Sequence, residues 1–130
     1  MKYILLPFAA WVISGSIKFL INEIRFGKGR ELQGYGGLPS THTTIISSVV
    51  FFYGFSESFF TPTFTIGLSV MLLFIMDAHN LRIKIGKHAE ILNKLQNETV
   101  LRERMGHTWL EISCGLILGA VIGYVFANFL

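Results

Sequence analysis

The chain has 130 residues, of which 52% are hydrophobic and only 15% are charged. Soluble domains carry about 25% charged residues, and the mean hydropathy of this chain is +0.55. One cysteine, three prolines and twelve phenylalanines exclude a disulfide scaffold, collagen and a disordered chain. Charge is also unevenly spread, because nothing basic lies between Arg30 and Arg82 or after Arg104. We therefore expect an integral membrane protein.

Four apolar runs approach the length of about 20 residues that a membrane-spanning helix needs. We predict spans at about 3–24, 41–57, 62–78 and 107–130. The predicted fold is an all-α membrane four-helix bundle in which residues 1–130 form a single domain.

An additional amphipathic helix is predicted over about 81–105. Leu81, Ile85, Leu92 and Leu95 recur there at helical spacing, while lysines occupy other faces. Such a helix either extends the third span beyond the bilayer or lies at the membrane interface.

Basic residues are concentrated on one side of this topology. With four spans, both termini and the 56–62 turn share one side, and the 22–42 loop and the 77–107 segment share the other. The second side carries ten of the eleven basic residues, namely Lys18, Arg25, Lys28, Arg30, Arg82, Lys84, Lys87, Lys94, Arg102 and Arg104. The positive-inside rule then predicts that these two loops face the cytoplasm.

Polar residues capable of chemistry collect at the predicted helix ends on that same side. Ionisable groups at membrane depth are functional candidates by default. If these groups converge, they form one site with three cations, at least two imidazoles and two carboxylates. They are Lys18, Arg25, Ser40, His42, Asp77, His79, Arg82, His107 and Glu111.

This set of side chains suits a phosphate group. Cations and a serine hydroxyl bind tetrahedral oxyanions, and the turn at 36–42 (GGLPSTH) leads into a helix N-terminus, whose free N–H groups attract phosphate. Glu111, four residues after His107, could hold that imidazole in one tautomer, while His42 could protonate a leaving alkoxide. The pattern predicts phosphoryl transfer through a phosphohistidine.

These motifs resemble the type 2 phosphatidic acid phosphatase superfamily, and above all its small divergent branch, which is related to acid phosphatases and vanadium haloperoxidases. Lys18 and Arg25, with six residues between them, resemble the first motif. Residues 39–42 (PSTH) resemble the second motif, and residues 107–111 (HTWLE) resemble the third. The divergent branch is also similar in Gly-Gly-x-Pro-Ser-x-His, in Asp77-Ala78 followed by Arg82, in Leu92-Asn93 and in Gly106-His107-Thr108.

The resemblance implies a role for each site residue. His107 would be the nucleophile, Glu111 its orienting carboxylate and His42 the general acid. The phosphate would be held by Lys18, Arg25, Ser40 and Arg82, with Thr41 and Asp77 in support. The main family keeps an arginine close before the histidine, whereas Arg82 stands twenty-five residues before His107.

The expected partners follow from this assignment. They are a lipid phosphate substrate and the bilayer, with no nucleic acid, no metal and no other cofactor. Gly115, Gly119 and Gly123 repeat every four residues, which favours close helix packing or a homodimer. We interpret His79 and His88 as loop or helix-surface residues.

The leading hypothesis is a membrane phosphatase that hydrolyses a lipid phosphate or pyrophosphate. Three alternatives stay open: a metal-dependent membrane hydrolase, a lipid-phosphate binding or transport protein without turnover, and a structural membrane subunit. The metal alternative would use Asp77 or His79 as a third ligand beside His107 and Glu111. A cytoplasmic site would favour phosphatidylglycerol phosphate over the other lipid phosphates.

Overall fold

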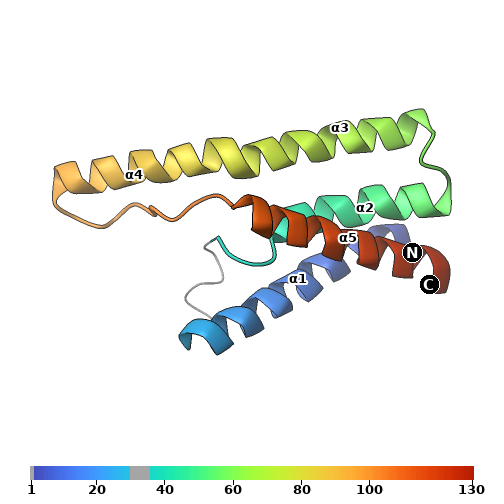
Figure 1. The fold of residues 1–130 in the computed structure, drawn as a ribbon, viewed down its shortest axis with the longest axis horizontal. Coiled ribbons are helices and arrows are strands. Elements are labelled where there is room, and N and C mark those ends of the chain that lie inside the picture. The colour runs from blue at the N-terminus through green and yellow to red at the C-terminus, as the bar shows by residue number, and fades with distance from the viewer. Residues whose placement is uncertain (1, 30–35) are drawn as a thin grey trace.

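The computed structural model describes residues 2–29 and 36–130 and is all-helical over that part of the chain (Figure 1). Its elements are α1 (Lys2–Phe26), α2 (Thr41–Ser56), α3 (Pro62–Met76), a π-helical turn η1 (Asp77–Leu81), α4 (Arg82–Gln96) and α5 (Trp109–Phe129). The predicted all-α class is confirmed. Arg30, one of the basic residues counted for the orientation, lies outside the described residues.

Three helices are long and apolar enough to cross a membrane: Tyr3–Phe26, the continuous Pro62–Gln96 and Trp109–Phe129. They make this a membrane protein. α2 has 16 residues, which is about 24 Å of helix, less than the hydrocarbon core of about 30 Å. The second of the four predicted spans therefore stays a prediction.

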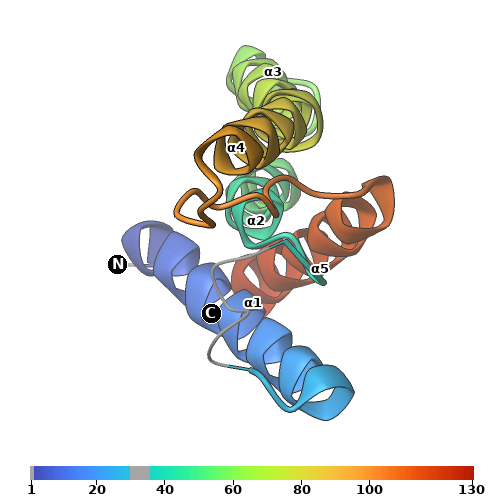
Figure 2. The same ribbon diagram turned by 90° about the vertical axis from the view of Figure 1, so that its left-hand side faces the viewer.

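α2 is the central helix of the bundle, in contact with α1, α3 and α5. Figure 2 shows it between the α3–α4 helix on one side and the crossing pair α1 and α5 on the other. Its buried surface carries small hydroxyl residues that bond to backbone carbonyls one turn earlier: Ser47 Oγ donates to Thr43 O at 2.6 Å, and Thr44 Oγ1 to Ser40 O at 3.0 Å. Because these side chains are short and already satisfied, a neighbouring helix can approach closely.

Three glycines of α5, which we call the glycine stripe, pack against this surface of α2: Gly115, Gly119 and Gly123. A Cβ on Gly115 would lie 2.7 Å from Ser40 O, and one on Gly123 would lie 2.7 Å from both Phe52 N and Ser48 O. A Cβ on Gly119 would collide with Ser47 Oγ. The stripe therefore packs α5 against α2 within one chain, and it no longer supports the predicted homodimer, which stays untested.

α3, η1 and α4 form one continuous helix that projects past the other helices (Figure 1). The helix begins at Thr61, whose side chain accepts a bond from Phe64 N at 3.1 Å, with Pro62 in the first turn. The helix predicted over 81–105 thus extends the third helix, but it ends at Gln96 rather than at 105. Asn97 terminates it by adopting a left-handed conformation with φ 51°.

Residues 97–108 return along α4 toward the bundle. Asn93 holds this return segment, because its Nδ2 donates to Leu101 O at 2.7 Å and to Glu103 Oε1 at 2.8 Å, while its Oδ1 accepts from Leu101 N at 2.9 Å. The return segment brings Arg102 near Lys18 of α1 and His42 of α2, since all three line one cavity. The middle of α1, the start of α2, η1 and the start of α5 consequently lie close together.

Candidate active site

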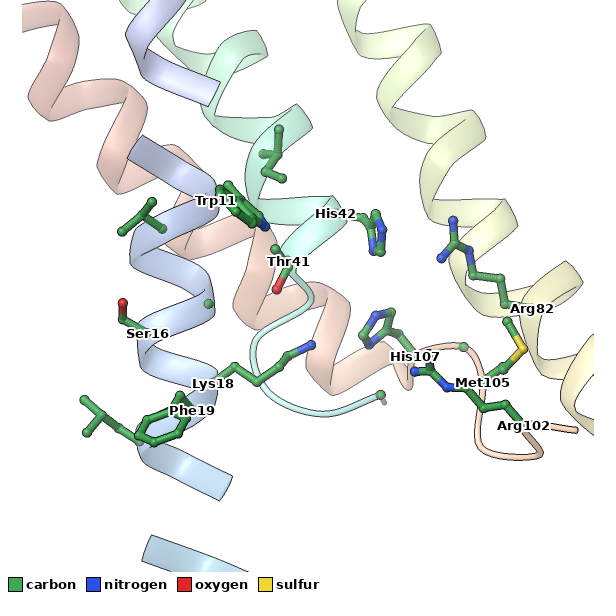
Figure 3. A pocket seen from close by; sticks show the side chains of 16 residues that line it. Trp11, Ser16, Lys18, Phe19, Thr41, His42, Arg82, Arg102, Met105 and His107 are labelled. Atoms are coloured by element: carbon green, nitrogen blue, oxygen red, sulfur yellow. The ribbon is translucent and has the colours of Figure 1, made fainter. Parts of the chain in front are cut away.

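A cavity of about 1110 Å³ lies between these segments. We call it the site cavity. Figure 3 shows side chains from α1, α2, α4 and the return segment pointing into it. Its positively charged or titratable lining residues are Lys18, His42, Arg82, Arg102 and His107. Four of these five belong to the predicted set.

Glu111 holds the ring of His107. Nδ1 of His107 lies 3.0 Å from Oε2 of Glu111, and because a carboxylate only accepts hydrogen bonds, Nδ1 is the donor. The same Oε2 accepts from Thr108 N at 3.0 Å, while Thr108 Oγ1 accepts from Glu111 N at 3.3 Å, so Glu111 also closes the capping box of α5. Nε2 of His107 is left as the ring nitrogen that can act in the site cavity.

The backbone of His107 is anchored to η1. His107 N donates to Ala78 O at 3.0 Å, and His79 Nδ1 lies 3.0 Å from His107 O. The π-helical turn makes this possible, because Arg82 N bonds to Asp77 O five residues back, leaving Ala78 O to receive a partner from another segment. His79, interpreted from the sequence as a loop or helix-surface residue, is half-buried on η1 and also fixes the peptide of His107.

Gly106 allows the chain to pass this close to η1. It has φ +87°, and a Cβ there would lie 2.6 Å from Ile83 Cγ1, 2.9 Å from Ile83 N and 3.1 Å from Ala78 O. A glycine directly before His107 is thus required by both conformation and space.

His42 and Arg82 face His107 from the neighbouring helices. The ring centroids of His42 and His107 are 6.5 Å apart. Arg82 Nε donates to Asp77 Oδ2 at 2.8 Å, in a pair that is about one-third exposed. Asp77 therefore orients Arg82, as its predicted supporting role requires.

Lys18 enters the site cavity from α1, and Figure 3 shows its side chain extending toward His107. Only 4% of its surface is exposed. An ammonium group taken out of water needs a compensating anion nearby. Lys18 is thus well placed to hold an anionic ligand.

Two predicted phosphate ligands do not line the site cavity. Arg25 is exposed in the last turn of α1, about 10 Å further along the helix than Lys18. Ser40 is fully buried, with its Oγ 2.8 Å from Thr43 Oγ1 and its N–H bonded to Glu111 O at 3.0 Å. Thr41, the next residue, does line the cavity.

A family model described as "Divergent PAP2 family" matches residues 1–122. The chain belongs to the Divergent PAP2 family. Searches of curated proteins and of solved structures each found no match. Membership confirms the resemblance predicted from the motifs and relates the chain to a phosphatase superfamily.

Arg102 is the cavity residue that the sequence prediction missed in this Divergent PAP2 protein. It lies in the return segment, five residues before His107, and Figure 3 shows it on the same side of the cavity as His107 and Arg82. The spacing could have indicated it, because the main family keeps an arginine close before the histidine. The motif-based prediction gives that role to Arg82 alone.

The protonation of His107 follows from its surroundings. Burial lowers the pKa of its imidazole below the ordinary value, and the positive charges of Lys18 and Arg82 act in the same direction. The hydrogen bond and the charge of Glu111 oppose this effect without reversing it. His107 is consequently neutral near pH 7, the state in which Nε2 can attack a phosphorus atom.

Within residues 2–29 and 36–130, no three His, Cys, Asp or Glu side chains are arranged to hold one metal ion. His79, a candidate third ligand of the metal alternative, bonds instead to the carbonyl of His107. In the described part of the chain, no group of side chains therefore offers the three ligands that the metal-dependent alternative requires.

Proposed function

We propose that this protein is a membrane lipid phosphatase that transfers a phosphoryl group to His107 and then to water, without a metal. The observation that carries the proposal is the pairing of His107 with Glu111 beside a cavity that collects Lys18, Arg82 and Arg102. A positioned neutral imidazole next to three cations suits attack on a phosphate monoester.

In the first step, Nε2 of His107 attacks in line, and the N–P bond forms as the bond from phosphorus to the lipid oxygen breaks. His42, whose protonated form is favoured by the negative charge of the bound phosphate, gives its proton to that oxygen, so a lipid alcohol or, from a pyrophosphate, a lipid monophosphate leaves. In the second step, water attacks the phosphohistidine and gives a proton to neutral His42. The N–P bond breaks, and inorganic phosphate and the starting enzyme are regenerated.

The spacing of the two imidazoles supports these roles. Their centroids are 6.5 Å apart, and reacting atoms in a near-attack geometry are about 3–3.5 Å apart. A phosphoryl group can therefore sit between the two rings, with one nitrogen on the attacking side and the other near the leaving oxygen. Lys18, Arg82 and Arg102 would neutralise its remaining oxygens.

We also propose that the site faces the cytoplasm. In the predicted four-span topology, the side that holds the site residues carries ten of the eleven basic residues of the chain, as the positive-inside rule expects of a cytoplasmic face. A lipid phosphate formed on that leaflet, such as phosphatidylglycerol phosphate, is the favoured substrate. Lys28→Cys in a Cys114→Ser background tests this: an impermeant maleimide should label it only after the cells are permeabilised.

The activity itself is tested by phosphate release in detergent from phosphatidic acid, phosphatidylglycerol phosphate and a polyprenyl pyrophosphate. His107→Ala should lose at least about 10³-fold in kcat, while His88→Ala, a change on the exposed face of α4, should match the wild type. Activity should survive a chelator.

Each alternative gives a different result in the same assay. Loss of activity with chelator and its return with a divalent ion would indicate the metal-dependent hydrolase. Tight vanadate binding without any hydrolysis would indicate a binding or transport protein. A His107→Ala protein that still supports the function of the wild type in cells would indicate a structural subunit.

A further inference from the structure

A second cavity continues the site cavity along α1. It has a volume of about 620 Å³ and is lined by Leu5, Phe8, Ala9, Val12, Phe126 and Leu130. Val12 lines both cavities. The two cavities therefore adjoin at Val12, and together they form a hollow surface that follows α1 from Lys18 toward its N-terminal end.

The part of the site cavity that lies along α1 is apolar and open to the outside of the bundle. Trp11, Val12 and Leu20 line it and are 59%, 57% and 57% exposed. Exposed apolar side chains on a membrane helix face lipid, so this part of the cavity opens sideways into the bilayer. The cations lie at its other end.

Gly15 lines the site cavity on α1, between Val12 and Lys18 in the sequence. A Cβ built on it would meet no heavy atom within 4 Å outside its own helix, among the described residues. The other glycines of the bundle contrast with it, because a Cβ on Gly115 or Gly123 would collide with α2. Packing against the described residues therefore does not account for a glycine at position 15, whereas space for a ligand does.

The length of the hollow surface matches one lipid chain. Ten residues separate Lys18 from Phe8, which is about 15 Å along a helix. One leaflet of a hydrocarbon core of about 30 Å has the same depth. A phosphate held at Lys18 would leave a chain running along α1 in the direction that lipid chains take.

We propose that this surface, the α1 trough formed by Leu5, Phe8, Val12, Gly15 and Phe19, binds one acyl chain of the lipid phosphate. Gly15 is then a specificity-determining residue that admits the chain. This inference rests on the proposed function for the identity of the headgroup. It also predicts that the enzyme prefers lipids whose chains reach across a leaflet, since shorter phosphate esters make no contact with the trough.

The test compares two substrates in one series of variants. The substrates are a long-chain phosphatidic acid in mixed micelles and a water-soluble short-chain phosphatidic acid. Gly15→Leu and Gly15→Phe should lower kcat/KM for the long-chain lipid by about ten-fold or more, because a displaced chain misplaces the phosphate. Hydrolysis of the short-chain lipid should change by less than about two-fold. Ile13→Phe is the control, since it adds bulk to an exposed position of α1 that lines neither cavity.

The proposal is overturned if Gly15→Phe affects both substrates equally, or neither. The first result would mean that the residue shapes the site itself, and the second that the hollow surface holds only bulk bilayer lipid.

A binding measurement separates this proposal from the proposed function. If the wild type hydrolyses nothing, the phosphatase proposal fails, but the trough is still tested by thermal unfolding with each lipid. Long-chain phosphatidic acid should stabilise the wild type and Ile13→Phe but not Gly15→Phe. Equal stabilisation of all three proteins would refute the trough.

Discussion

Oε2 of Glu111 accepts a hydrogen bond from Nδ1 of His107 at 3.0 Å while it also caps the first turn of α5. One carboxylate oxygen thus couples the start of a membrane helix to the orientation of the proposed nucleophile. Substitution can separate these two tasks. A neutral acceptor at position 111 can still cap α5, but it gives little support to a developing imidazolium on His107.

Glu111→Gln should slow the reaction without unfolding the protein. Glutamine still accepts the Thr108 N–H bond of the capping box, but it lacks the charge that stabilises His107 as it becomes positive. We expect kcat to fall by about 10²-fold and the thermal midpoint in detergent to stay within about 2 °C of the wild type. A large drop in the midpoint would show that Glu111 is mainly structural.

The acidic limb of the pH profile should report His107. Because the neutral imidazole attacks, kcat/KM should fall as the pH drops through the pKa of His107, which burial places below the ordinary value of about 6.5. Glu111→Gln removes an influence that raises this pKa, so the limb should move to lower pH. Lys18→Met removes a positive charge that lowers it, so that limb should move to higher pH. Shifts in the same direction would contradict the proposed electrostatics.

The structure and the motif pattern disagree on which arginine binds the phosphate, Arg102 or Arg25. Arg102 lines the site cavity, whereas Arg25 does not. A charge-assisted hydrogen bond to phosphate contributes about 1.5–3 kcal/mol, so Arg102→Gln should lower kcat/KM by about 10–100-fold. Arg25→Gln should change it by less than about three-fold, as should Lys87→Gln on the exposed face of α4. A larger loss for Arg25→Gln than for Arg102→Gln would favour the motif assignment.

Gly106→Ala should destabilise the protein and displace His107. A Cβ there would lie 2.9 Å from the backbone nitrogen of Ile83, and φ at this residue is +87°. Because neither the close contact nor the positive φ is easily relieved, we expect the free energy of unfolding to fall by about 1–3 kcal/mol. Gly15→Ala is the matched control, because its Cβ would meet no heavy atom of the described residues within 4 Å outside its own helix, and alanine favours a helix by up to about 1 kcal/mol. Differential scanning of both variants in the same detergent measures the contrast.

The amino-acid sequence by itself determined the membrane-helical class and the local part of the site. Apolar length requires no tertiary information, and the pairing of His107 with Glu111 follows from two residues four positions apart at a helix start. The starts of α3 and α5 are likewise local features, because the proline at position 62 and the capping box of Thr108 act over a single turn.

Only the tertiary structure decided which cations lie in the site cavity and what holds His107 in place. The location of Arg102 depends on the path of the return segment, which Asn93 sets by bonding to Leu101 and Glu103. The roles of His79 and Ala78 depend on a π-helical turn meeting a loop almost thirty residues later in the chain. Hydrophobic periodicity cannot encode such meetings, because they arise from the packing of whole helices rather than from the spacing of neighbours.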